Sequence, residues 1–497
     1  MKQTHSALPA RRAISIPPLR AIFDGRVIGP SDGDYDQARK VFNGAIDRRP
    51  AFIVRARGAL DVSRVVTLAR EHGLELAVRS GGHSPAGHGV SDGGIVLDLS
   101  DMKALELDIE RRTAWAETGL TAGEYTSATG ARGLATGFGD AATVGIGGIT
   151  LAGGIGYLVR THGLTIDNVL AAEIVTADGR LLRTDARTHP DLFWAIRGGG
   201  GNFGVVTRFQ FRLHAVDAIL GGMLVLPASP EIITALVAEA DAAPEELSTI
   251  ASVVLAPPLP GLPAAMRGRP VVMVRMVHAG DIAAGERAIA PFRALAQPLV
   301  DTVKPMRYAG MFPRDEGGHR NVLMHAMFAD DIDRGSAAAI IEHLQLSTAK
   351  MAAVEIRVLG GAMARVSADA TAFAHRGARM MMNVAAMYER TEEAATHERW
   401  VDDLAAALHG RHSGVYAGFL GAEGEARVRD AYPGATWDRL AAIKQRYDPD
   451  NLFRLNQNVP PSAKGSPCVP ALGDHRAGLE VASIEAGGGS IEVAFRS

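Results

Sequence analysis

Glycine is concentrated in three short stretches of the chain, and such stretches can bind phosphate. Many of the 56 glycines fall within residues 81–94, 145–156 and 198–204. Backbone N–H groups that line a concavity neutralise phosphate oxygens, and glycine lets the backbone come close to them. Glycine-rich turns can also simply link strands, but three such clusters favour a site for an anion or a nucleotide pyrophosphate.

Two patterns near these glycines suggest other chemistry, and their context excludes it. Gly199, Gly201 and Gly204 spell GxGxxG, but the true dinucleotide fingerprint follows a strand and opens a helix. Here a helix is expected before it and a strand after it, so the dinucleotide interpretation is rejected. GHSPA around Ser84 lacks the second glycine of a hydrolase nucleophile elbow.

Two histidines and a tyrosine are the side chains best suited to chemistry. His83 and His88 share one loop, where a metal pair is conceivable but has no cysteine or carboxylate partner nearby. A loop histidine can be polar filler, or a nucleophile that bonds to a cofactor ring. Tyr416 is expected in mid-strand, either as a core residue or as a base whose pKa would have to fall from about 10.

The elements that must position these residues form an alternating pattern before residue 215. Strands are expected at 51–55, 74–78, 95–100, 113–118 and 203–214. A hairpin is expected at 171–185, with Asp178-Gly179 as its turn.

Helices are expected between these strands. One is capped by Asp61 and stops at Gly73, one runs from about Thr121 to Gly133, and one covers 190–196.

Residues 215–425 have a different character, with strands and amphipathic helices but few glycine clusters. Strands are expected at 270–277, 354–360, 379–389 and 414–421, and helices at 283–296, 336–347 and 396–409. This arrangement predicts one sheet with a helical layer on one face. A helix capped by Thr436 and running to Tyr447 follows, and residues 462–497 are expected to be a loose tail.

Composition limits the class of protein. The 497 residues predict two domains, and a net charge of −3 gives no reason to expect nucleic-acid binding. No run approaches the roughly 18 apolar residues of a membrane span, and the basic N-terminus lacks the apolar core of a secretory signal. The lone Cys468 excludes an intrachain disulfide or a multi-cysteine metal site, and no metal is expected. A cytoplasmic α+β protein is therefore expected, with its oligomeric state open.

Four segments together resemble one family of flavoproteins. The first is RSGGHSPAGHGVSDGGIVLDL (79–99), and the others span 143–179, 191–207 and 447–461. They are similar to the vanillyl-alcohol-oxidase and p-cresol-methylhydroxylase superfamily, in its berberine-bridge-enzyme-like branch. The resemblance implies a two-part FAD-binding domain (26–214 and 426–461) and a substrate domain (215–425) whose antiparallel sheet is covered by helices. Residues 1–25 would form an N-terminal tail.

The resemblance also implies which residues would hold FAD. The backbone of residues 79–84 would wrap the pyrophosphate, and His83 would bond to the flavin 8α-methyl group. Asn456 and Gln457 would close the other side of the ring. The full set implied to bind the cofactor is Arg79, Ser80, Gly81, Gly82, His83, Ser84, His88, Gly89, Thr143, Val144, Gly147, Gly148, Gly153, Gly154, Gly156, Asp167, Asn168, Val175, Asn456 and Gln457.

This sequence departs from the family pattern at three places. Many relatives have a second flavin bond from a cysteine where this chain has Ala141, so a single covalent link through His83 is expected. His162 replaces the tyrosine of an xYGL motif. Gly418 replaces the asparagine of a YxN motif whose tyrosine, Tyr416, is kept and becomes the candidate catalytic base.

The resemblance implies an FAD-dependent oxidase of a small organic substrate, with oxygen as electron acceptor and hydrogen peroxide as product. Val144 occupies a position that governs oxygen access in plant relatives, and valine there goes with oxidases. A monooxygenase or cyclase of secondary metabolism, a dehydrogenase with another acceptor, and a flavin-retaining protein without catalysis are the alternatives.

Overall fold

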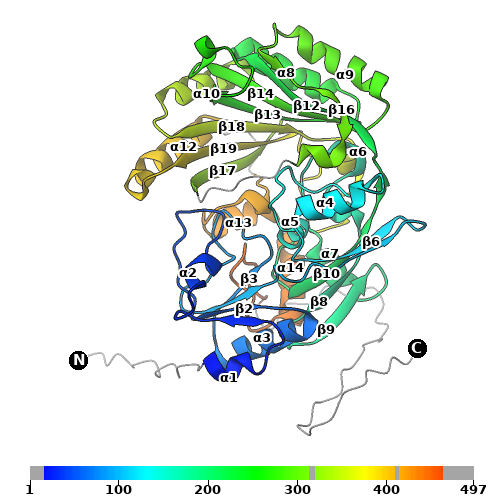
Figure 1. Cartoon of the computed structure of the whole chain (residues 1–497), viewed down its shortest axis with the longest axis vertical. Coiled ribbons are helices and arrows are strands. Elements are labelled where there is room, and N and C mark those ends of the chain that lie inside the picture. Colours follow the sequence, from blue (N-terminus) through cyan, green and yellow to red (C-terminus); the bar gives the residue numbers. More distant parts are fainter. Residues whose placement is uncertain (1–15, 313–319, 409–413, 463–497) are drawn as a thin grey trace.

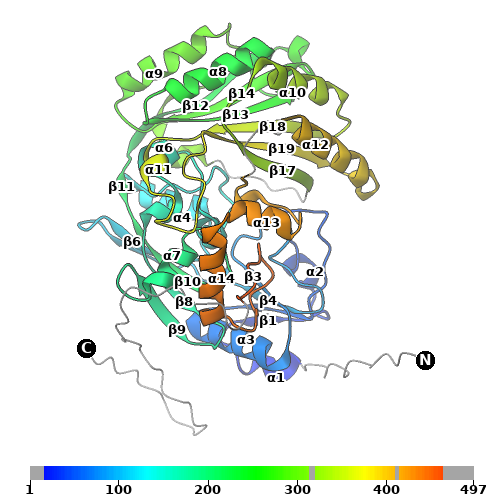
Figure 2. The same ribbon diagram turned by 180° about the vertical axis from the view of Figure 1, so that it is seen from behind.

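The computed structural model describes residues 16–312, 320–408 and 414–462. Figures 1 and 2 show two stacked parts, a broad helix-covered sheet above and a part with two smaller sheets below. Helices and largely antiparallel sheets are both present, and the expected α+β class is confirmed.

The first sheet of the lower part is four-stranded, in the order β1-β2-β4-β3. Its strands are β1 (Arg26–Ile28), β2 (Phe52–Arg55), β3 (Leu76–Arg79) and β4 (Ile95–Asp98). β2 and β3 both pair parallel to β4, and β4 is buried along its whole length. Continuous apolar runs such as FIVR and IVLD are typical of parallel strands that are covered on both faces.

The second sheet of the lower part is antiparallel, in the order β5-β6-β10-β8-β9. Its strands are β5 (Leu105–Asp108), β6 (Thr113–Glu117), β8 (Val169–Val175), β9 (Leu181–Asp185) and β10 (Val205–Arg212). The β8–β9 hairpin turns at Gly179 with φ of 83°, which confirms the expected turn. The GxGxxG segment follows helix α7 (Pro190–Ile196) and precedes β10, as expected.

Short helices and one short strand pair complete the lower part. The remaining elements there are α1 (Ile16–Arg20), α2 (Tyr35–Ala38), α3 (Ala59–His72), α4 (Ala122–Gly130), α5 (Ile146–Ala152), α6 (Val159–His162), the 3₁₀ helix η1 (Thr165–Asn168), and the β7 (Leu134–Ala135) and β11 (His214–Ala215) pair. Thr121 caps α4 in a capping box with Glu124.

The upper part is an eight-stranded antiparallel sheet in the order β15-β12-β14-β13-β18-β19-β17, with β16 also paired to β12. Its strands are β12 (Ala218–Pro227), β13 (Leu247–Leu255), β14 (Pro270–His278), β15 (Val300–Asp301), β16 (Lys304–Arg307), β17 (Asn321–Ala329), β18 (Met351–Val358) and β19 (Met380–Tyr388). One face is covered by α8 (Pro230–Ala242), α9 (Ile282–Ala294), α10 (Arg334–Leu346) and α12 (Ala394–Leu408), as Figure 1 shows. The helical layer expected on one face is therefore present.

The chain returns to the lower part after this sheet. The returning helices are α13 (Glu425–Ala431) and α14 (Ala435–Tyr447), and α11 (Ala362–Arg365) packs against α6. Figure 2 shows α14 beside α7. The fully buried Lys444 ammonium of α14 donates to the carbonyls of Asn202 and Phe453 and pairs with Asp448 at 2.7 Å. These bonds fasten the C-terminal segment to the third glycine cluster.

Three local expectations were wrong. Residues 414–421 are not a strand, because the chain turns there into the 3₁₀ helix η5 (Ala417–Phe419), where Phe419 N–H donates to the Tyr416 carbonyl. α3 begins at Ala59, and Asp61 in its first turn instead accepts N–H bonds from Asp24, Gly25 and Arg57. α14 starts after Gly434, one residue before Thr436.

The expected N-terminal tail (1–25) is already packed from α1 onward, because Leu19 and Phe23 are apolar and join the core beside α3. Most of the expected C-terminal tail, with Cys468, lies outside the described residues. Within the described ranges, every helix is too short or too polar to cross a membrane.

Candidate active site

A cavity of about 390 Å³ lies where the three glycine clusters meet. Its wall includes the loop after β3, the start of α5, the Gly200–Gly204 segment, the η5 turn and the C-terminal pair Asn456 and Gln457. Phe42, Met324, Phe419 and Leu455 make much of the wall apolar. Segments separated by more than 350 residues therefore share one enclosed space.

The two glycine loops that line the cavity lie backbone against backbone. A Cβ atom on Gly81 would lie 2.2 Å from Gly145 N, and one on Gly145 would lie 2.2 Å from Gly81 N. Side chains are therefore excluded from this contact. The arrangement leaves backbone groups facing the cavity, as a pyrophosphate-binding cradle requires.

Arg79 supports this cradle from behind. Its buried guanidinium donates to Asp98 at 2.8 Å and to the Ala38 carbonyl at 2.7 Å. Burial alone would raise the pKa of Asp98, but the adjacent Arg79 charge holds it below the usual value. The Arg79 side chain is thus committed to β4 and α2, which leaves its backbone for a ligand.

Two polar atoms of the cavity wall are buried and lack a hydrogen-bond partner among the described residues. They are Asn456 Oδ1 and Tyr432 Oη. Buried polar groups normally have partners, and a polar ligand in the cavity would supply partners for these two atoms. Together with the glycine cradle, they fit a nucleotide cofactor with a polar ring system.

Both loop histidines line the cavity. The His83 ring stacks on Phe42, with centroids 4.5 Å apart and planes inclined by 20°. Burial, aided by the nearby Arg48 charge, lowers the pKa of His88 to about 4 and keeps its imidazole neutral. No cluster of three potential metal-ligating side chains occurs in the described ranges.

The structure brings together most, but not all, of the residues implied to bind FAD. The cavity wall contains Arg79, Ser80, Gly81, Gly82, His83, Ser84, His88, Gly89, Val144, Gly147, Gly148, Asn456 and Gln457. Seven others are not in that wall: Thr143, Gly153, Gly154, Gly156, Asp167, Asn168 and Val175.

Several of these seven support the wall from behind. Asp167 forms a two-pronged ion pair with Arg376, with both N···O distances 2.7 Å. Asn168 donates to the carbonyls of His162 and Leu164. A Cβ on Gly156 would lie 1.4 Å from the Phe138 carbonyl oxygen, so this glycine allows two backbones to pack.

His162, the replacement in the xYGL motif, stacks on His214. The ring centroids are 3.8 Å apart, the planes differ by 7°, and His214 Nε2 lies 2.6 Å from Asn168 Oδ1. Burial and the neighbouring His162 lower the pKa of His214 to about 4, so the pair stacks as neutral rings. The substitution therefore serves packing between α6 and β11.

Tyr416 lies in the cavity wall and is almost fully buried, at 3% exposure. Its hydroxyl oxygen accepts a hydrogen bond from Gly154 N–H at 3.0 Å. Burial raises the pKa of Tyr416 to about 12, and the Gly154 hydrogen bond and the Arg357 charge oppose that rise. The protein alone therefore leaves this phenol protonated at neutral pH.

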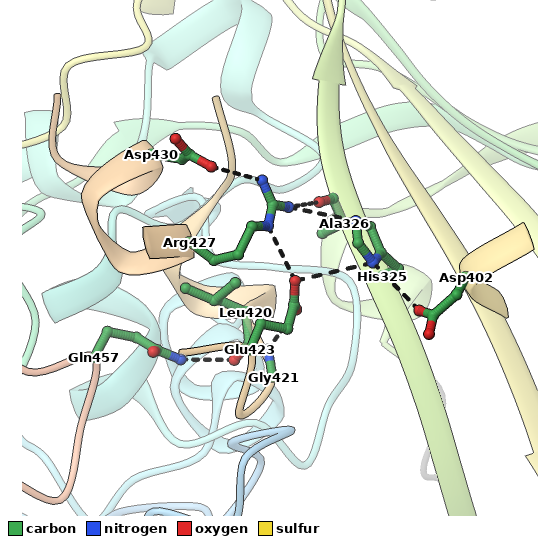
Figure 3. A network of polar contacts seen from close by, with 9 residues as sticks. All are labelled: His325, Ala326, Asp402, Leu420, Gly421, Glu423, Arg427, Asp430 and Gln457. Carbon is green, nitrogen blue, oxygen red and sulfur yellow. Dashed lines mark hydrogen bonds and ion pairs between the residues drawn. The ribbon is translucent and has the colours of Figure 1, made fainter. Parts of the chain in front are cut away.

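The segment that carries Tyr416 is tied down at several points (Figure 3). Gln457 Nε2 donates to the Leu420 carbonyl at 2.6 Å. Glu423 pairs with Arg427 at 3.1 Å, and Arg427 also donates to the Ala326 carbonyl on β17. This network (His325, Asp402, Glu423, Arg427 and Asp430) joins the upper sheet to α13.

A partly buried charge cluster beside the cavity, centred on the buried Arg357, was missed by sequence reasoning. Asp140, in the cavity wall, pairs with Arg357 at 3.0 Å and with Arg275 at 3.3 Å, and both arginines pair with Glu355. Burial alone would raise the pKa of Asp140, but Arg357 and Arg275 keep it below the usual value. The available signal was an arginine in each of two otherwise largely apolar strands, MVRMV and VEIRV.

Comparisons with known proteins agree with this geometry. Residues 50–185 match the FAD binding domain family, and residues 419–460 match the family described as berberine and berberine like. The (R)-6-hydroxynicotine oxidase of Paenarthrobacter nicotinovorans is 32% identical over 88% of this chain and 97% of its own length. The chain belongs to the berberine-bridge-enzyme-like family of FAD-linked oxidoreductases.

One further relative and one solved structure extend the comparison. The FAD-linked oxidoreductase YvdP of Bacillus subtilis (strain 168) is 32% identical over 88% of this chain and 98% of its own. The crystal structure of 6-hydroxy-D-nicotine oxidase from Arthrobacter nicotinovorans superposes with a TM-score of 0.80 at 28% identity, covering 88% and 98% of the two chains. The fold is therefore that of the berberine-bridge-enzyme-like flavoproteins.

Family membership establishes the general activity. The protein is an FAD-linked oxidoreductase that acts on small organic molecules. Its cofactor is FAD, and the glycine cradle and the unpartnered polar atoms fit that cofactor. Ala141 and Val144 both line the cavity. Position 141, where the resemblance places a second flavin-linking cysteine in many relatives, carries only a methyl group here.

Proposed function

We propose that this protein is an FAD-dependent oxidase of an alcohol, sugar, amine or secondary metabolite, with oxygen as electron acceptor. The observation that carries the proposal is the position of Tyr416, which shares one cavity with the glycine cradle and His83. FAD held in the glycine cradle would supply the hydride acceptor for the substrate, and transfer of its two electrons to oxygen would give hydrogen peroxide. The name of the (R)-6-hydroxynicotine oxidase relative also supports an oxidase.

Different residues of the chain bind the cofactor and transfer the proton. Backbone groups of the loops at Gly81 and Gly145 bind the pyrophosphate, and His83 forms the single covalent bond. Asn456 Oδ1 and Tyr432 Oη are free to bind polar groups of the cofactor or the substrate. Tyr416 holds or accepts the proton that a substrate O–H or N–H loses as its carbon gives up hydride.

The covalent bond can be tested without knowing the substrate. Acid precipitation should leave the yellow colour in the pellet, and peptide mapping should place the flavin on the peptide with His83. His83→Ala should release FAD on denaturation, whereas exposed His72→Ala should behave as the wild type. Colour only in the supernatant of the wild-type protein would exclude the covalent bond, and absence of flavin would refute the whole proposal.

The choice of electron acceptor needs a substrate screen. Peroxide formed in step with substrate consumption identifies an oxidase, whereas oxygen in the product identifies a monooxygenase or cyclase. Fast turnover with a dye and slow turnover with oxygen identifies a dehydrogenase. Tyr416→Phe should keep the flavin spectrum and slow anaerobic flavin reduction, and unchanged reduction would remove Tyr416 from the mechanism.

A further inference from the structure

The hydroxyl of Tyr416 is held by the backbone and not by a side chain. Gly154 N–H donates to Tyr416 Oη at 3.0 Å, although the two residues are 262 positions apart. Because a phenol has one proton, a hydroxyl that accepts from this amide directs its own O–H elsewhere. The hydrogen bond therefore both orients the proton and supplies a donor to the oxygen if it ionises.

The Gly154 amide is itself fixed in place. Gly154 has φ of 81°, a conformation suited to glycine, and a Cβ there would lie 1.9 Å from Thr165 Oγ1. Its carbonyl accepts from Thr165 N–H at 3.0 Å, and the Gly153 carbonyl accepts from Ile166 N–H at 3.1 Å. Thr165 Oγ1 also donates to the Gly137 carbonyl at 2.7 Å. The 3₁₀ helix η1 thus pins the two glycines and aims the amide at Tyr416.

Gly418 is what lets the tyrosine ring reach that amide. A Cβ on Gly418 would lie 2.6 Å from Tyr416 Cζ and 2.8 Å from Tyr416 Oη. Contacts below 3.0 Å force something to move, so the observed ring position requires glycine at 418. Position 418 is also where this chain lacks the asparagine of the YxN motif.

We propose that Gly154 and Gly418 are positioning residues for Tyr416, and that the Gly154 backbone amide replaces a side-chain partner in stabilising the ionised phenol. The inference rests on the proposed role of Tyr416 as the proton-accepting group. Tyr416 first loses its own phenol proton to solvent, and the ionised oxygen then forms a new O–H bond with the proton that the substrate O–H or N–H releases. The Gly154 amide stabilises the ionised phenol that must form before this transfer, against the burial that favours the protonated form.

Other groups around the phenol act in known directions. The Arg357 guanidinium and, more weakly, the Ile155 backbone amide also favour ionisation, and Tyr432 is a neighbouring neutral phenol. Phe373 and Phe419 provide apolar contacts, with ring centroids 6.3 and 5.4 Å away. Burial opposes ionisation, so losing the amide donor should have a large effect.

The test is a titration of Tyr416 itself in the holoenzyme, which needs no substrate. Site-specific 2,3,5-trifluorotyrosine at position 416 makes the phenol more acidic, and its fluorine NMR shifts report the pH midpoint of its ionisation. Gly418→Ala should raise the ionisation midpoint of the residue at 416 by about one to two pH units, because the hydrogen bond from Gly154 N–H to the ionised oxygen is lost. Gly421→Ala is the matched control, because its Cβ would make only ordinary contacts with the Glu423 side chain, at 3.5 Å and 3.9 Å.

A second variant removes the donor without adding an atom. Replacing Gly154 by glycolic acid exchanges the N–H for an ester oxygen and should give a similar upward shift. If Gly418→Ala fails to fold, this ester decides alone. A midpoint unchanged from wild type in the ester overturns the inference, whatever Gly418→Ala does.

The outcome is separable from that of the proposed function. If no substrate reduces the flavin but the midpoint shifts, the oxidase proposal fails and the positioning of Tyr416 stands. If substrate reduces the flavin normally and the ester does not shift the midpoint, only the inference drawn from Gly154 fails. If both the oxidase proposal and the inference hold, the pH dependence of anaerobic flavin reduction should shift to higher pH together with the ionisation midpoint.

Discussion

The two halves of the cavity are built by different means. The cofactor side consists of backbone that glycine allows to approach closely, as at Gly81 and Gly145. The side facing the upper sheet consists of side chains such as Met324 and Phe419, supported by the partly buried cluster of Asp140, Arg275, Glu355 and Arg357. A backbone site leaves a signature in residue type, whereas a side-chain site depends on which strands come together. The first can be read from sequence and the second cannot.

The largest effect is expected from breaking the charge cluster. Arg357→Met should lower the free energy of unfolding by up to about 3–5 kcal/mol, because the partly buried Asp140 and Glu355 carboxylates then keep only Arg275 as a charged partner. Denaturant unfolding of the holoprotein measures this. Arg379→Met, which removes an exposed ion pair with Asp241, should cost about 1 kcal/mol or less. Equal losses would show that the cluster has no special role.

The next effect tests the cofactor side. Gly81→Ala should reduce flavin content about tenfold or more, because its Cβ would lie 2.2 Å from backbone at Gly145 and overpacking costs about 1–3 kcal/mol. The ratio of flavin to protein absorbance measures the content. Gly33→Ala, where a Cβ meets nothing within 4 Å, should bind flavin normally. Full flavin content in Gly81→Ala would contradict a backbone-built cradle.

The third effect is a loss of stability in mild acid. The pKa of His88 is about 4 in the folded protein and about 6.5 when unfolded, so the unfolded chain binds the proton more readily between these values. The contribution of His88 is therefore constant above pH 6.5 and falls by about 3 kcal/mol as the pH drops towards 4.

Thermal midpoints recorded across this range check the prediction. The decline should be shallower in His88→Gln, whereas exposed His72→Gln should follow the wild type. His214, also shifted to about 4, should keep part of the decline in every variant. A His88→Gln curve parallel to that of the wild type would show that this histidine is not buried neutral.

The smallest effect is expected from weakening the ion pair that helps to hold the Tyr416 segment in place. Glu423→Gln weakens the bond to Arg427, which is partly exposed, so stability should fall by about 1 kcal/mol or less. Anaerobic flavin reduction should slow modestly because the segment becomes more mobile. Glu425→Gln, which removes an exposed pair with Arg429, should leave the reduction rate unchanged. A change in both variants would assign the effect to α13 as a whole.

The difference between local patterns and long-range contacts explains how much of the structure could be predicted from the sequence. The parallel strands at 51–55 and 95–100, the β8–β9 hairpin and the helix-covered sheet follow from apolar periodicity and were predicted close to their observed bounds. The segment at 414–421 looked like a strand because it is apolar, but its turn depends on Gly418, on the Gln457 bond to the Leu420 carbonyl and on the bond from Gly421 N–H to Glu423.

Candidate site residues show the limit more sharply. Residue type and resemblance together pointed to His83, Tyr416 and the glycine loops, which the structure brings into one cavity. They did not reveal that Asp167 pairs with Arg376, or that Gly154 contacts Tyr416, because both contacts join residues more than 200 positions apart. Nothing in local sequence encodes such pairs.

The position of Asn456 and Gln457 in the cavity wall has a consequence for how the enzyme is made. Ribosomes deliver the glycine loops first, then the whole upper sheet, and only at the end the segment held by Lys444. Until that segment arrives, the cofactor site has no closing wall. The complete cofactor site therefore forms only after nearly the whole chain has been synthesised, although its glycine loops are made early.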